Sequence, residues 1–155
     1  MHKFVSRLTI LGIYLLSSPI LWASEVQIDP FFKIDKISYK KGRLVLPVTR
    51  RKYHNIKVLD EHTFTWLQTC ASETKCVQEK KELPFRVEMI RPVVTRQNMW
   101  IAEVSFAEQW LIVFLLFKNP NGYVLKEPDH FKFLDVTLAT KIRQELEQMV
   151  QGTTL

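Results

Sequence analysis

The sequence predicts an α+β fold, in which a mainly antiparallel β-sheet of the meander or sandwich type carries a C-terminal amphipathic α-helix packed on it. Two observations lead to this prediction. Between residues 32 and 127, short segments alternate apolar and polar side chains and are separated by turn residues, a pattern typical of half-buried antiparallel strands. From Leu138 onward, the spacing of the apolar residues changes to that of a helix with one buried face.

The first part of the chain predicts short strands joined by polar turns. Lys40-Lys41-Gly42 is the turn of a first hairpin, and Pro47 places the second strand of that hairpin at a sheet edge, since proline cannot donate to a neighbouring strand. Phe64 and Trp66 alternate with threonines, so their segment is also interpreted as a strand. The predicted strands are Phe32–Tyr39, Arg43–Val48, Asn55–Leu59, Thr63–Leu67, Phe85–Met89 and Trp100–Phe106.

The segment Trp110–Phe117, WLIVFLLF, is apolar on both faces of a strand. It predicts a central strand that is covered on two sides. A hairpin to Tyr123–Glu127 follows, because Pro120 suits the first corner of a turn and Gly122 suits a left-handed position.

The C-terminal segment predicts a helix of about four turns. Asp135 or Thr137 can cap its first turn, and charged pairs lie on its polar face. We expect the apolar stripe to pack on the sheet and to cover the second face of Trp110–Phe117; docking on a partner is the alternative. The stripe consists of Leu138, Ile142, Leu146, Met149 and Val150.

Residues 1–23 have the pattern of a secretory signal peptide, with two basic residues and an apolar run, followed by the small residues Ala23 and Ser24 on either side of the cleavage position expected after Ala23. The apolar run of about 14–15 residues is shorter than the roughly 20 that span a bilayer, which favours cleavage over a membrane anchor. We therefore expect residues 24–155 to form one exported domain, periplasmic or secreted, without a transmembrane segment after processing.

Cys70 and Cys76 are the only two cysteines of the chain, and five residues separate them. In an exported protein, a single pair usually closes as a disulfide, which makes a local structural clasp the first interpretation. A redox-active pair is an alternative, because the polar intervening loop with Lys75 could expose the sulfurs and favour the thiolate. Two metal ligands are a third, but no nearby histidine completes a zinc site, and we expect no metal.

The segment Thr63–Phe85, TFTWLQTCASETKCVQEKKELPF, resembles part of one family, the periplasmic N-terminal domain of the thiol:disulfide interchange protein DsbD. In that family, two redox cysteines with this separation lie on an immunoglobulin-like β-domain, follow a strand and precede a polar stretch that leads to a proline. The resemblance implies that Cys70 and Cys76 exchange electrons with a partner dithiol. It covers 23 residues, and 79 residues follow Cys76 here, whereas the family places its cysteines late in the domain.

Little in the sequence points to catalysis. After residue 23, the only glycines are Gly42, Gly122 and Gly152, which serve turns or a helix end and leave none for a phosphate-binding loop or a nucleophile elbow. A hydrolase would need His62 or His130 beside a serine, for which Ser72 and Ser105 are the candidates. We expect these side chains to be solvated turn residues, and we expect no catalytic residue and no cofactor.

Positive charge is concentrated between residues 33 and 57. Nine Lys and Arg residues occur there against Asp35 alone, a local net charge of +8, whereas the rest of the mature chain carries −4. Such segregation predicts a positive face for an anionic partner, and export excludes nucleic acid as that partner. A solvated sheet edge protected from aggregation is the alternative. The residues predicted to bind are Lys40, Lys41, Arg43, Arg50, Arg51 and Lys52.

The sequence therefore predicts an exported, non-enzymatic accessory protein of the bacterial envelope, for example in a secretion or envelope assembly. Its basic face would bind an envelope protein or an anionic envelope component. Thiol–disulfide exchange through Cys70 and Cys76 is the second hypothesis. The sequence leaves the identity of the partner and the oligomeric state open.

Overall fold

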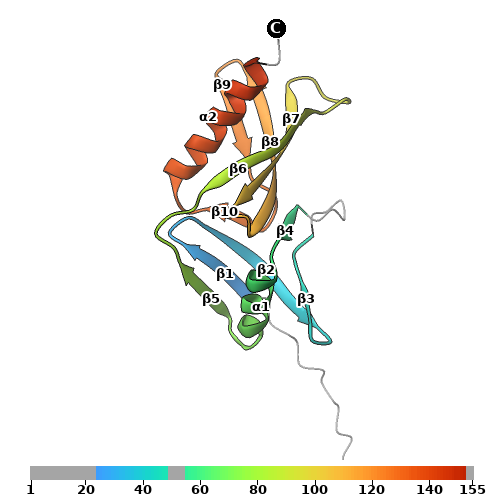
Figure 1. The fold of residues 1–155 in the computed structure, drawn as a ribbon. Helices are drawn as coiled ribbons and strands as arrows, with labels where there is room; N and C mark the ends of the chain where they lie inside the picture. The colour runs from blue at the N-terminus through green and yellow to red at the C-terminus, as the bar shows by residue number, and fades with distance from the viewer. Residues whose placement is uncertain (1–23, 49–54, 153–155) are drawn as a thin grey trace, which may run out of the picture.

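The computed structural model of the chain describes residues 24–48 and 55–152, and these residues form two β-sheets and two α-helices (Figure 1). The predicted α+β fold class, with antiparallel sheet and a C-terminal helix packed on it, is confirmed. The elements in chain order are β1 (Ser24–Asp29), β2 (Phe32–Lys40), β3 (Arg43–Val45), β4 (Ile56–Val58), α1 (Glu61–Thr69), the 3-10 helix η1 (Cys70–Ser72), β5 (Lys75–Glu79), β6 (Phe85–Pro92), β7 (Met99–Phe106), β8 (Trp110–Asn119), β9 (Gly122–Lys126), β10 (Phe131–Phe133) and α2 (Val136–Gly152).

The first sheet has the strand order β10-β2-β1-β5, and β3 pairs with the far end of β2. The predicted β2–β3 hairpin is confirmed. Two features of this sheet were not predicted. Strand β1 directly follows the expected signal peptide, and it buries Ser24, Val26 and Ile28 on one face. Strand β5 lies parallel to β1, with Val26 opposite Cys76, so the sheet is not wholly antiparallel.

The second sheet has the order β4-β8-β7-β6, with β9 pairing on the same strand as β4 but farther along it. Strands β6 to β9 form an antiparallel meander, which agrees with the prediction. The turn between β8 and β9 brings Asn119 opposite Gly122, whose φ of 125° is a conformation that glycine adopts without strain. Strand β8 is central, as its sequence predicted.

The predicted strand Thr63–Leu67 is wrong, because these residues lie in helix α1. Asp60 caps this helix: its Oδ2 accepts a hydrogen bond from the backbone N–H of Thr63 at 3.2 Å. Thr63, Leu67 and Cys70 are buried at helical spacing, while Phe64 remains 43% exposed. The alternation of Phe64 and Trp66 with threonine therefore did not mark the buried face.

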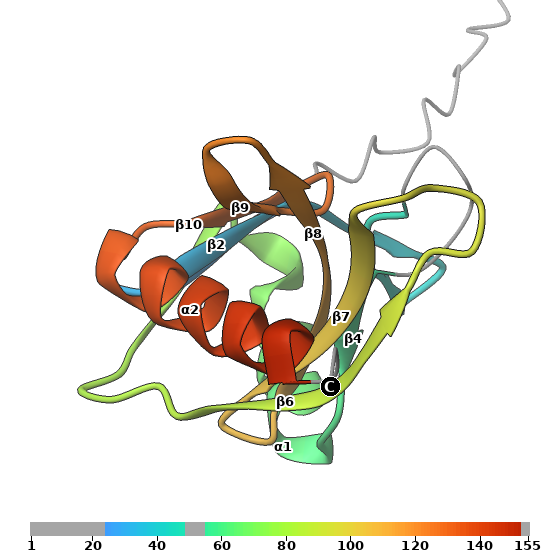
Figure 2. The same ribbon diagram turned by 90° about the horizontal axis from the view of Figure 1, so that it is seen from above.

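Helix α2 confirms the predicted C-terminal helix. Asp135 rather than Thr137 is its cap, since Asp135 Oδ1 accepts from the backbone N–H of Thr137 at 2.8 Å. Its buried face presents Leu138, Ile142, Leu146 and Val150, whereas the predicted stripe residue Met149 is 39% exposed. The helix contacts β6, β9 and β10, and Figure 2 shows β6, β7 and β8 curving around it.

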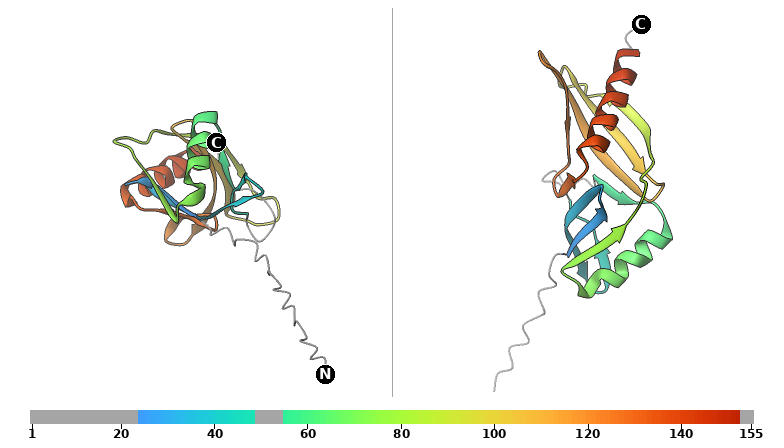
Figure 3. Two further views of the ribbon diagram at one scale, coloured as in Figure 1. Left: turned by 90° about the horizontal axis from the view of Figure 1, so that it is seen from below. Right: turned by 90° about the vertical axis from the view of Figure 1, so that its left-hand side faces the viewer.

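Both sheets contribute to one continuous core. Phe32 of the first sheet contacts Phe106 and Trp110 of the second, with ring centroids 5.5 and 6.1 Å apart. Phe114 of β8 stacks on Phe133 of β10, with centroids 5.4 Å apart. These contacts join the sheets end to end, and the two helices lie at opposite ends of the molecule (Figures 1 and 3).

The two faces of β8 differ, contrary to the prediction that both are covered. Trp110, Ile112, Phe114 and Leu116 point into the core and are fully buried. The alternate residues Leu111, Val113, Leu115 and Phe117 are only half-buried, and they do not belong to the core cluster. Figure 2 shows α2 on the concave side of the sheet, and the residues on the other side of β8 are not among those that pack in or against the core formed by the described residues.

Candidate functional site: a basic hairpin beside a disulfide clasp

The predicted basic residues Lys40, Lys41 and Arg43 lie together at the tip of the β2–β3 hairpin. Lys40 pairs with Arg43 across the hairpin, and Lys41 and Gly42 form the turn with φ values of 51° and 72°. Positive φ at both turn residues matches the right-handed twist of the flanking strands. All three cationic side chains are exposed, and within residues 24–48 and 55–152 none of them forms an ion pair.

The other three predicted binding residues, Arg50, Arg51 and Lys52, lie outside the described residues. The structure therefore brings together half of the predicted set, at the tip of the hairpin.

Not every cation of the basic segment is available to a partner. Lys33 Nζ donates to Glu25 Oε2 at 3.0 Å and lies 3.5 Å from Asp35 Oδ1. The hydrogen bond from Lys33 lowers the pKa of Glu25, and the same bond raises the pKa of Lys33. Lys36 is different, because it lies exposed at a bulge of β2 with a φ of 61°. It adds to the charge of this sheet, although the sequence analysis did not single it out.

A largely apolar depression of about 520 Å³ adjoins the hairpin. It lies between β3, β4 and α1, and its lining includes Leu44 and Phe64 as well as the exposed cation Lys57. The lining residue Leu44 directly follows Arg43 in the chain, so a positive surface continues into an apolar one. A partner that is anionic and partly apolar fits this combination.

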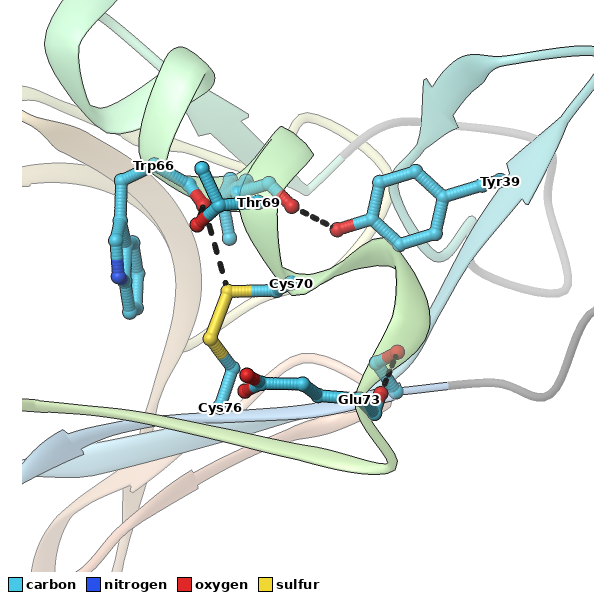
Figure 4. Close-up of a disulfide and its surroundings, with 8 residues drawn as sticks. Tyr39, Trp66, Thr69, Cys70, Glu73 and Cys76 are labelled. Carbon is cyan, nitrogen blue, oxygen red and sulfur yellow. Dashed lines mark hydrogen bonds between the residues drawn. A yellow bond between two sulfur atoms is a disulfide. The ribbon is translucent and has the colours of Figure 1, made fainter.

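The disulfide joins Cys70, at the end of α1, to Cys76 in β5 (Figure 4). Cys70 has no exposed surface and Cys76 is 6% exposed. Cys70 Sγ lies 3.4 Å from the carbonyl oxygen of Trp66, and the Tyr39 hydroxyl donates to the carbonyl oxygen of Leu67. The disulfide to β5 and the Tyr39 bond from β2 hold α1 against the first sheet, as a structural clasp would.

The redox hypothesis depended on exposed sulfurs after a strand. In the structure the sulfurs are buried, and a helix rather than a strand precedes Cys70. The residues between the cysteines are exposed, including Lys75 at the start of β5, but they do not bring the sulfurs to the surface. Attack by a partner thiolate would first require local opening of this region, because exchange proceeds through direct contact between sulfurs.

The serine and histidine candidates for hydrolysis are not brought together by hydrogen bonds of the described residues. Ser105 Oγ donates to Glu88 Oε1 at 2.5 Å, and Arg86 also donates to that carboxylate. The Ser105 hydroxyl is the main cause of the lowered pKa of Glu88. His62 lies in α1 and His130 in the loop before β10. In the part of the chain that is described, no three His, Cys, Asp or Glu side chains gather as metal ligands would.

Comparisons with known proteins gave no match to a family model, a curated protein or a solved structure. Neither helix described here has the length and apolar character needed to cross a membrane.

Proposed function

We propose that this chain is an exported, non-enzymatic accessory protein of the bacterial envelope that binds an anionic partner through the β2–β3 hairpin. The observation that carries the proposal is the exposed cluster of Lys40, Lys41 and Arg43 on a tight turn, none of which forms an ion pair with another described residue. A tight two-residue turn presents its charges in a defined geometry, so less conformational entropy is lost when a partner binds.

Because of this charge cluster, we expect fast association with an anionic partner and weaker binding at high salt. Opposite charges at an exposed face accelerate encounter, and salt screens them over about 8–10 Å. The partner is an envelope protein with an acidic patch or an anionic component such as a lipid headgroup. The leader-like residues 1–23 and the Cys70–Cys76 disulfide support export to an oxidising compartment.

The test compares two triple variants of equal net charge. One is Lys40→Glu/Lys41→Glu/Arg43→Glu; the control reverses three exposed cations elsewhere, Lys81→Glu/Lys132→Glu/Lys141→Glu. Binding is measured by crosslinking in the native envelope and by co-sedimentation with anionic or neutral vesicles, each over a range of salt. The hairpin variant should lose salt-sensitive binding, and the control should retain it.

Equal loss in both variants would show that only net charge matters and would refute a hairpin site. Retained binding in the hairpin variant would also refute the hairpin site, and a second variant, Arg50→Glu/Arg51→Glu/Lys52→Glu, then tests the other half of the predicted basic face. If this variant also keeps every envelope interaction and its salt dependence, the proposed basic face is refuted. Loss of vesicle binding alone identifies lipid as the partner, and loss of crosslinks alone identifies protein.

A further inference from the structure

The second sheet carries an apolar surface that the proposed basic face does not use. It lies on the side of β7, β8 and β9 that points away from α2, and Ile101 of β7 is opposite Leu115 of β8 in it. Val124 of β9, opposite Phe117, is 48% exposed. We name this surface the outer strip; its residues are Ile101, Leu111, Val113, Leu115, Phe117 and Val124.

The outer strip has the dimensions of a helix-binding surface. From Leu111 to Phe117 it runs along six residue steps of a strand, about 20 Å at roughly 3.4 Å per residue. It spans β7, β8 and β9, and the two spacings of about 4.8 Å between these strands give a width of about 10 Å, close to the diameter of an α-helix. A helix of about four turns matches this length, and α2 already packs on the opposite side of the same sheet.

Cations border the outer strip on both sides. Lys57 of β4 is opposite Leu111 and Lys126 of β9 is opposite Leu115, whereas Arg91 of β6 is opposite Ile101 of β7. All three side chains are exposed, and no described carboxylate pairs with any of them. Carboxylates on both flanks of an apolar helix would complement these margins.

One carboxylate lies in the middle of this surface. Glu103 of β7 is half-buried opposite Val113, without a salt bridge to any described residue. Covering it with hydrocarbon would cost several kcal/mol unless the covering group supplies a cation or a hydrogen-bond donor. A lipid tail cannot supply one, but a lysine or arginine side chain can. Glu103 therefore favours a protein over a bilayer as the covering partner.

A second copy of this chain fits less well. The cations Lys57, Lys126 and Arg91 outnumber the carboxylates of this surface, which are Glu103 and, in the depression at one end, Glu127. The net charge is therefore +1, and two such surfaces face to face would repel each other. One end of the strip is also hollowed, where Phe117, Val124 and Lys126 line a depression of about 660 Å³. A bulky side chain at one end of an approaching helix can occupy it.

We propose that the outer strip binds an amphipathic helix of a partner protein, whose apolar stripe is flanked by carboxylates and carries one cationic side chain near its middle. This surface lies on the second sheet, whereas the basic hairpin belongs to the first, and only Lys57 both borders the strip and lines the depression beside the hairpin. The strip therefore adds a second contact of different chemistry.

The test uses three synthetic peptides about four turns long. The first has a leucine stripe with glutamate on both flanks and one lysine at its centre, the second replaces that lysine by leucine, and the third scrambles the first. Binding to the full chain is followed by fluorescence anisotropy. Val124→Glu should weaken binding of the first peptide by roughly tenfold. The matched control is Val77→Glu on β5, since Val77 is 47% exposed and lies on the first sheet.

Glu103→Gln tests the central contact. This variant should lose about tenfold in affinity for the lysine peptide and should lose none for the leucine peptide, because only the lysine pairs with the carboxylate. Near-ultraviolet circular dichroism of each variant checks that the fold is retained.

Four results would overturn the proposal: no binding of the first peptide, equal binding of the scrambled peptide, equal effects of Val124→Glu and Val77→Glu, or equal effects of Glu103→Gln on both striped peptides. Binding of anionic vesicles that Val124→Glu abolishes, without peptide binding, would instead identify a lipid-binding surface. A dimer in analytical ultracentrifugation that Val124→Glu dissociates would identify a second copy as the occupant.

Discussion

Replacing both cysteines by alanine should lower the free energy of unfolding by about 2.4 kcal/mol or somewhat more. The disulfide closes a loop of seven residues, since its cysteines are six positions apart. In the chain-entropy model such a loop removes about 8 cal/mol/K from the unfolded state, which is about 2.4 kcal/mol at 25 °C. Cys70 is fully buried, so loss of its sulfur adds a packing cost. At roughly 3–5 °C per kcal/mol for a chain of this size, Tm should fall by about 7–12 °C.

The assay is urea unfolding of the full chain and of Cys70→Ala/Cys76→Ala, followed by tryptophan fluorescence and far-ultraviolet circular dichroism. Hydrogen exchange should show the largest loss of protection in α1 and β5, which the disulfide connects. An unchanged midpoint, or protection lost evenly over both sheets, would refute the view that the disulfide stabilises α1 on the first sheet.

The reduction potential of the same pair separates the clasp from thiol exchange. A structural bond should have a potential below about −300 mV, whereas exchange proteins lie between about −120 and −270 mV. Both sulfurs are buried, so we expect the lower range and slow reduction by glutathione in the absence of denaturant. A value in the upper range, with rapid reduction of the folded protein, would revive the exchange hypothesis.

Three further predictions concern the first sheet and α1. Tyr39→Phe removes the buried hydroxyl that donates to an α1 carbonyl and should cost about 1–2 kcal/mol in urea unfolding; unchanged stability would mean that this bond contributes nothing net. Asp60→Ala removes the α1 cap and should cost about 0.5–2 kcal/mol, while the exposed first-turn control Glu61→Ala should cost less; the two midpoints are compared directly. The pKa of Glu25 is lowered by the hydrogen bond from Lys33, so its contribution to stability is present above the ordinary carboxyl pKa of 4.5 and is lost as the pH falls through the lower folded value. Glu25→Gln should therefore flatten the acid limb of the stability curve below about pH 4.5, and an unaltered limb would contradict this.

The sequence predicted most strands because their burial alternates with a period of two. Helix α1 was not predicted by this pattern. Phe64 is exposed and Trp66 is only half-buried, so the alternation of aromatic residues did not mark the side that faces the core. The helix is indicated by less conspicuous residues: Asp60 is a possible cap, and Thr63, Leu67 and Cys70 follow it at helical spacing. When a short segment fits both the period of a strand and the period of a helix, periodicity alone cannot assign its secondary structure. Here the contact of the segment with the first sheet favours the helix.

The sequence predicted which residue types form the candidate site, but it predicted their positions in the fold only in part. Clustering of cations along the chain indicated a basic surface, and the two-residue turn explains why Lys40, Lys41 and Arg43 share one hairpin tip. Charge counting could not show that Lys33 is neutralised by Glu25, because these residues meet only when β1 and β2 pair and bring them to one side of the sheet. A formal local charge therefore overstates what a partner encounters.

The apolar run of β8 shows why composition did not reveal the outer strip. A strand that is apolar on both faces indicates that both faces are covered, and the structure covers only the face toward α2 and β10 with described residues. Exposed apolar surface of this kind lowers solubility unless a partner covers it.

If the hairpin and the outer strip are separate contacts, their variants should respond differently to salt. Ion pairing at the hairpin weakens as salt is added, whereas at the strip only the ion pairs of its margins weaken and the burial of apolar surface does not. Combining Lys41→Glu with Val124→Glu should then give additive losses of partner affinity, and strong coupling between them would mean that one partner element spans both sheets.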